Sequence, residues 1–191
     1  MNNIIDKADF DDSALLGSGK AKIDTLSSLV SGESHFLFGK RYELLVEELP
    51  HYPNVIQMQG KKIYMLVKPD TTIEQRATIM REWYRALLKN QLATTIKRWA
   101  ERLGESNYDW QVKQMKTEWG SCVKSKRMLI FNLELARVPI ECLEFVVVHE
   151  FCHFVIYNHN KLFEALMTKR LPNWRTLRKQ LNDFIALPYK E

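Results

Sequence analysis

The chain has 191 residues, of which 46% are hydrophobic, and its formal net charge is +5. This length suits one domain with a substantial core, and no apolar stretch is long enough to span a bilayer. Because the N-terminus lacks a signal-peptide pattern and the three cysteines form no paired framework, we expect a soluble, cytoplasmic protein with reduced thiols.

The first thirty residues differ from the rest in composition. They are acidic and rich in serine, and they show little hydrophobic periodicity. We predict that residues 1–30 form a mobile tail or an appended short segment. Residues 31–191 are predicted to form a single domain.

The pattern changes at His35, where short apolar runs alternate with turn residues. Gly39 separates the first two runs, and Gly60-Lys61 separates the next two. These runs predict an antiparallel, β-rich part with strands at residues 36–38, 42–46, 55–59 and 62–67.

A long helical pattern follows the predicted strands. Thr72 and Gln75 can form a capping box at its start, and Gly104 can end it. Apolar residues recur every three or four positions between these limits. The pattern fits one bent helix or two helices, with Asn90 as the predicted interruption.

The remaining sequence predicts a small sheet and three helices. Alternating apolar residues at 108–112 indicate a strand, and residues 119–122 and 128–131 can pair as a hairpin across a basic turn. Helices are predicted from about Pro139, over residues 161–170, and from a cap at Asn173 to about Phe184.

Residues 149–153 read His-Glu-Phe-Cys-His, and His159 follows six residues later. Residues four apart lie on one face of a helix, so that His149 and His153 can bind one metal ion. Glu150 lies about 100° around the helix from His149 and can point toward a metal-bound water. His159 can supply a third ligand, which leaves a fourth position for water, as in catalytic zinc sites. The alternative is three histidines without a metal.

Residues 111–128 carry a net charge of +4. Such a segment attracts phosphates and nucleic acid through its field alone. The alternative is a solvated lysine-rich turn.

The chain resembles the YgjP-like metallopeptidases, which are related to the SprT-like zinc proteases. The resemblance runs from about residue 35 to about residue 185. It rests on motifs in a consistent order, at residues 38–42, 115–122, 146–153, 158–163 and 171–174.

The resemblance implies an α+β, zincin-like fold: an antiparallel β-rich N-terminal part, a long helical segment, a small sheet packed on the His-Glu-x-x-His helix, and C-terminal helices. It implies that His149, His153 and His159 bind one Zn²⁺ per chain and that Glu150 is the catalytic acid/base. The metzincins share the spacing of the third histidine but carry glycine where this chain has Ile156. We therefore predict that the helix ends near Tyr157, with His159 in the following loop.

One position departs from the family pattern. Glu118 stands where a basic residue usually precedes the tryptophan, which implies a different substrate preference if that residue contacts substrate.

We therefore expect a zinc-dependent metallopeptidase acting on a peptide or protein substrate. An edge strand within residues 119–131 would pair with an extended substrate. Trp119 and Ser121 would line the site, or alternatively pack as a turn beneath the helix.

Two rival functions remain open from the sequence. The basic segment could hold a nucleotide, making the protein a metal-dependent nucleoside triphosphate pyrophosphatase. Alternatively, the protein is a non-catalytic zinc module associated with nucleic acid. A structural zinc would need a fourth protein ligand, for which Glu164 is the main candidate.

Overall fold

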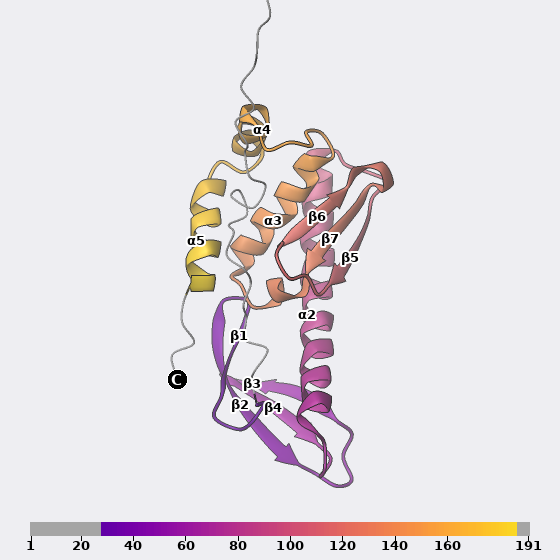
Figure 1. Ribbon diagram of the computed structural model, residues 1–191, viewed down its shortest axis with the longest axis vertical. Helices are drawn as coiled ribbons and strands as arrows, with labels where there is room; N and C mark the ends of the chain where they lie inside the picture. Colours follow the sequence, from indigo (N-terminus) through magenta and orange to yellow (C-terminus); the bar gives the residue numbers. More distant parts are fainter. Residues whose placement is uncertain (1–27, 187–191) are drawn as a thin grey trace, which may run out of the picture.

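The computed structural model describes residues 28–186, and the part of the predicted tail at residues 1–27 lies outside the described residues. The described chain has an α+β fold with two small sheets and four α-helices. Figure 1 shows the first sheet at one end of the molecule, the second sheet toward the other end, and the long helix α2 running past both.

The first sheet contains the four strands that the sequence predicted. They are β1 (Ser34–Leu37), β2 (Lys40–Glu48), β3 (Val55–Gln59) and β4 (Lys62–Val67), in the order β1-β2-β4-β3. The two predicted hairpins are antiparallel, but β2 and β4 pair in parallel. The sheet is therefore mixed rather than purely antiparallel, because strand periodicity does not specify which edges of two hairpins meet. The pairing aligns buried Leu44 with buried Ile63.

The turn between β1 and β2 attaches this sheet to the rest of the domain. The amide of Phe38 donates to Ala136 O at 2.8 Å, and the amide of Gly39 donates to Arg137 O at 2.9 Å. Gly39 has a φ of 78°, and a Cβ added there would lie 2.8 Å from Cγ of Pro139. This glycine lets the turn approach the residue that precedes helix α3.

Helix α2 (Ile73–Leu103) is continuous. Both sides of the capping box between Thr72 and Gln75 are formed, and Gly104 ends the helix in a left-handed conformation. Asn90 is exposed within an unbroken helix, so the predicted interruption there is wrong. The helix is about 46 Å long at 1.5 Å per residue. Eight of its residues are buried, and they recur along the helix from Met80 to Ala100.

The second sheet contains β5 (Asp109–Lys113), β6 (Gly120–Val123) and β7 (Met128–Asn132), in the order β5-β7-β6. Strands β6 and β7 form the predicted hairpin, and the short 3₁₀ helix η1 (Lys124–Lys126) makes its turn. Strand β5 pairs in parallel with β7. Strand β6 is thus an edge strand, and it packs against helix α3.

The C-terminal part consists of the 3₁₀ helix η2 (Leu133–Ala136) and helices α3 (Ile140–His153), α4 (Lys161–Arg170) and α5 (Trp174–Ala186). Helix α3 is buried along most of its length and packs against α2, α4, α5 and β6. It is the central element of this half of the molecule (Figure 1). No helix in residues 28–186 is both long and apolar enough to cross a membrane.

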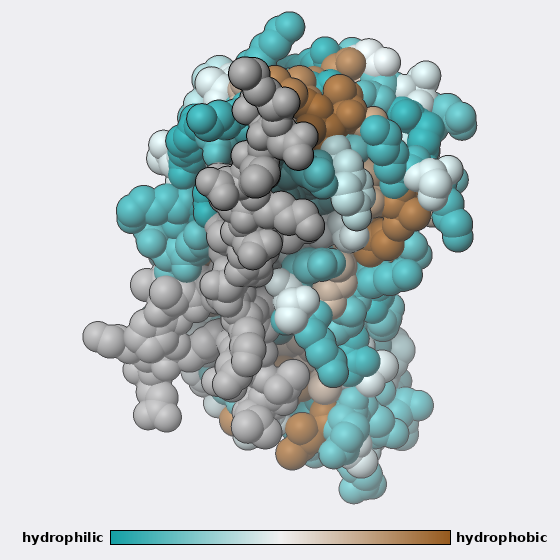
Figure 2. All heavy atoms as spheres, turned by 45° about the horizontal axis from the view of Figure 1, so that its top comes forward, coloured by the Kyte–Doolittle hydropathy of each residue, from teal (hydrophilic) through white to brown (hydrophobic). Residues whose placement is uncertain are grey.

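The hydropathy of the surface is shown in Figure 2, where most of the visible described residues are hydrophilic and the apolar residues occur in small patches. The large exposed apolar side chains include Val155, Tyr157 and Leu162. All three lie close in sequence to His159.

Candidate metal centre

Helix α3 brings two of the predicted ligands into the interior of the protein. Its sequence is apolar on nearly every face, as expected for a helix surrounded by other elements. His149 is 1% exposed and His153 is 9% exposed. Because both are held on a helix packed on several sides, their ring positions are fixed by the core.

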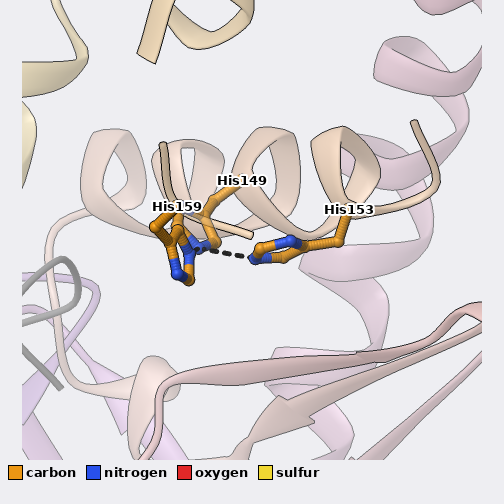
Figure 3. Close-up of side chains that lie close together, drawn as sticks. All are labelled: His149, His153 and His159. Carbon is orange, nitrogen blue, oxygen red and sulfur yellow. Dashed lines mark hydrogen bonds between the residues drawn. The ribbon is translucent and has the colours of Figure 1, made fainter. Parts of the chain in front are cut away.

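The three histidines predicted from the sequence converge in the structure. Nε2 of His149 lies 3.1 Å from Nε2 of His153 and 2.8 Å from Nε2 of His159. The rings of His149 and His153 lie on the same side of α3, and His159 joins them from the segment that follows (Figure 3). Within the described residues, these three form a group whose possible ligand atoms all lie within 4.8 Å of one another.

Helix α3 ends at His153, four residues before the predicted end near Tyr157. The amides of Val155 and Ile156 both donate to Cys152 O, so the chain turns away from the helix axis. Nδ1 of His153 then lies 3.2 Å from Ile156 O. A proton on Nδ1 donated to this carbonyl leaves the Nε2 lone pair for a metal. The early helix end therefore orients the second ligand.

Phe163 is a site residue that the analysis of the sequence missed. It is fully buried, and its ring centroid lies 4.9 Å from that of His149 and 4.7 Å from those of His153 and His159. It forms an apolar surface against all three imidazoles. The signal in the sequence was its position within the family motif at residues 158–163.

Asn160 fixes the start of α4 beside the third ligand. Its Oδ1 accepts hydrogen bonds from the amides of Leu162 at 3.0 Å and Phe163 at 3.1 Å. This N-cap sets the position of Phe163 relative to His159.

The surroundings of His149 favour its neutral imidazole. The pKa of His149 is lowered well below its usual value by burial, then by the neighbouring charges of His153, His159 and Arg178. A neutral imidazole has the lone pair that metal binding requires.

Glu150 is also buried, at 1% exposed, and its Oε1 has no hydrogen-bond partner among the described residues. Its carboxylate lies against Gly120 at the start of β6: a Cβ added at Gly120 would lie 2.6 Å from Oε1. Burial raises the pKa of Glu150 well above its usual value, and the negative charge of Glu118 adds to this effect. A buried carboxylate with an unsatisfied oxygen is costly to a fold, which suggests a functional reason for it.

The donor set fits a metal ion. Three nitrogen ligands suit zinc, and tetrahedral zinc–nitrogen bonds separate such ligands by about 3.3 Å, which is close to the two distances from Nε2 of His149. The group contains no thiolate or carboxylate from residues 28–186. Glu164 lies outside it, and its Oε2 accepts from Arg175 at 2.8 Å. The described residues thus leave a coordination position open.

The two residues predicted to contact substrate differ in position. Trp119 is 2% exposed and belongs to the core. This burial agrees with the alternative in which its indole packs beneath the helix. Ser121 is half-buried on edge strand β6. Contact of either residue with a substrate stays a prediction.

The cysteines are all unpaired in the structure, as predicted. Burial and the charge of Glu150 raise the pKa of Cys122 to about 12. This thiol is therefore protonated at neutral pH and is a poor nucleophile.

A model of the family described as "YgjP-like, metallopeptidase domain" matches residues 17–184. The match begins earlier than the resemblance seen from residue 35. Among solved structures, the metallopeptidase zymogen of Pyrococcus abyssi abylysin matches with a TM-score of 0.43 and 15% identity, covering 50% of this chain and 91% of that chain. No curated protein matches this chain.

Proposed function

Because the chain belongs to the YgjP-like metallopeptidase family, we propose that it is a zinc-dependent peptidase that uses Glu150 as its general base. One observation carries this proposal. Three histidines have nitrogens close enough together to bind one metal ion. The residue after His149 is Glu150, a buried glutamate with one unpartnered carboxylate oxygen. This pairing of an open nitrogen site with a desolvated carboxylate suits the activation of water.

His149, His153 and His159 would hold the metal ion. When bound, zinc supplies a water of lowered pKa and polarises the carbonyl that is attacked. Glu150 would accept a proton from that water and pass it to the nitrogen of the leaving group. Burial suits Glu150 to this role because a carboxylate with a raised pKa is a stronger base.

Edge strand β6 would bind the substrate backbone. One side of β6 pairs with β7, and β6 packs against the helix that carries Glu150. An extended peptide could add to the free edge through main-chain hydrogen bonds. This strand falls in the region where the sequence predicted such an edge.

We place the protein in the cytoplasm. Its three unpaired cysteines suit a reducing compartment. Cell fractionation with an antibody to the natural protein would test this.

The metal is tested first by elemental mass spectrometry of the purified protein. We expect about one zinc per chain in the wild type and loss of zinc in His149→Ala. Absence of metal from the wild type, even after zinc is added back, would contradict the proposed site.

The reaction is tested with casein and, separately, with each nucleoside triphosphate. We expect casein hydrolysis to fall by about 10²–10⁴-fold in Glu150→Gln, with zinc retained. Glu141→Gln, an exposed position on the same helix, is the matched control and should be fully active. Hydrolysis of nucleotides alone, lost in Glu150→Gln, would replace the peptidase proposal with a pyrophosphatase.

A further inference from the structure

The third ligand is carried by an irregular segment, residues 154–160, which we call the ligand loop. It has no helix or strand, and both Val155 and Tyr157 are exposed. Two features of the metal centre nevertheless depend on it: His159 itself, and the carbonyl of Ile156 that orients His153. Something outside the loop must therefore fix its position.

The turn of the β6–β7 hairpin contacts the start of this loop. Cζ of Arg127 lies 4.3 Å from the ring centroid of Phe154, in a cation–π arrangement. Nζ of Lys124 donates to Val155 O at 3.3 Å. Two cations of the basic segment thus contact residues of this chain, at the point where α3 ends and the ligand loop begins.

Arg127 is itself held firmly by the segment that follows α2. Its Nη2 donates to Oε2 of Glu105 at 2.7 Å, and its Nε donates to Asn107 O at 2.8 Å. The Glu105 side chain is 13% exposed. Charge-assisted hydrogen bonds from a planar guanidinium fix both distance and direction, so the ring of Phe154 meets a cation that has little freedom to move.

A second arginine reaches the same carboxylate from the far end of α4. Nη2 of Arg170 lies 4.0 Å from Oε1 of Glu105, and its Nη1 lies 3.7 Å from Sγ of Cys152 on α3. Glu105 therefore joins two arginines that flank the C-terminal end of α3, where the helix dipole favours positive charge. The ligand loop lies between α3 and α4, and these contacts hold the end at which it leaves α3.

We infer that Arg127 is a positioning residue for the metal centre, acting through Phe154 on the ligand loop. With Arg127 in place, the loop is ordered before metal binds, and binding does not have to supply the free energy of ordering it. Without Arg127, metal binding must order the loop as well, so the affinity falls. This inference rests on the metal site of the proposed function but not on a peptide being the substrate.

The test is zinc affinity, measured by competition with a chromophoric chelator, in Arg127→Ala, Arg127→Lys and Lys126→Ala. Lys126 lies exposed in the same turn and is the matched control. We expect Arg127→Ala to bind zinc at least tenfold more weakly than the wild type. Arg127→Lys should recover part of the loss because it keeps the charge over Phe154, and Lys126→Ala should match the wild type.

The visible spectrum of the cobalt-substituted protein separates positioning from general destabilisation. We expect altered band positions in Arg127→Ala at saturating cobalt, with a wild-type circular dichroism spectrum. Wild-type zinc affinity and an unchanged cobalt spectrum in this variant would overturn the inference. If Arg127→Ala does not fold, Phe154→Leu decides instead: it keeps an apolar side chain but removes the aromatic face, and unchanged affinity and spectrum would again overturn it. A wild type that binds metal normally but cleaves no peptide would refute the peptidase proposal alone.

Discussion

The buried carboxylate of Glu150 lowers the stability of the fold, whereas the proposed reaction requires it. Its side chain lies in the core between α3 and Gly120, where an ionised carboxylate loses its hydration. A hydrophobic or amide side chain there would suit the fold better. The proposed role of Glu150 as a general base would account for a carboxylate at this position.

Glu150→Gln should therefore stabilise the metal-free protein at neutral pH, by about 1–3 kcal/mol. Burial, with the charge of Glu118, raises the pKa of Glu150 in the folded state above its ordinary value of 4.5. The unfolded chain releases this proton at lower pH, so stability falls as pH rises from 4.5 through the raised pKa. Urea unfolding of both proteins in chelator at pH 5 and pH 8 measures the effect. An equal stability difference at the two pH values would contradict it.

Glu118→Gln should shift the pH profile of activity. The negative charge of Glu118 helps to raise the pKa of Glu150, and a general base must be deprotonated to act. Removing that charge lowers the pKa of Glu150, so the acidic limb of kcat/KM moves to lower pH. Glu134→Gln, a position not among the causes of this shift, should leave the limb in place. A shift to higher pH in Glu118→Gln would refute the electrostatic argument.

Gly120→Ala tests the contact between β6 and the carboxylate. The added Cβ would lie 2.6 Å from Oε1 and 2.8 Å from Cγ of Glu150, so the side chain must move. We expect a stability cost of about 1–3 kcal/mol and roughly a hundredfold loss of activity, with zinc content unchanged. In a double-mutant cycle with Glu150→Asp, the shorter side chain should relieve part of the loss; strictly additive losses would show that the two residues do not interact.

At the scale of elements, the metal centre is assembled from the end of one helix and the beginning of the next. Helix α3 carries two of the proposed ligands, the ligand loop carries the third, and α4 carries Phe163, whose ring contacts all three imidazoles. The boundaries of the two helices consequently determine ligand geometry. We therefore expect helix caps here to affect metal affinity as well as helix stability.

Asn160→Ala should show this dual effect. Loss of the side-chain acceptor for the amides of Leu162 and Phe163 should cost about 1 kcal/mol of stability and weaken zinc binding, because Phe163 and His159 lose their fixed relation. Asn160→Asp keeps the acceptor and should behave like the wild type in both thermal unfolding and chelator competition. Equal zinc affinity in all three proteins would confine the role of Asn160 to the helix.

At the scale of the whole molecule, α2 connects the two sheets. Its N-terminal half lies near the first sheet and its C-terminal half near the second (Figure 1), and buried residues occur along both halves. The turn at Phe38 and Gly39 provides a second attachment, next to the start of α3. The fold therefore gives no obvious point at which one sheet could unfold alone.

We predict that residues 31–191 unfold as one cooperative unit. Urea transitions followed by the fluorescence of the five tryptophans, all of which lie outside the first sheet, should coincide with loss of amide protection in β4 of that sheet. Two separate midpoints would show that the sheets belong to independent domains.

The sequence by itself determined the features that depend on neighbouring residues. The capping box at Thr72, the glycine end at Gly104, both early hairpins and the helix carrying His149 and His153 were predicted because caps, turns and periodicity act over a few residues. The three histidines were identified because ligand spacing on a helix is a local property, and the structure brings them together.

The tertiary structure decided what depends on contacts between distant segments. Parallel pairing of β2 with β4 and of β5 with β7 has no local signal, and the unbroken course of α2 through Asn90 reflects packing that outweighs a weak helix former. The same is true of the contact between Gly120 and Glu150, and of Phe163 against the imidazoles. Such contacts depend on how whole elements pack, because packing free energy is gained only when segments far apart in the chain meet.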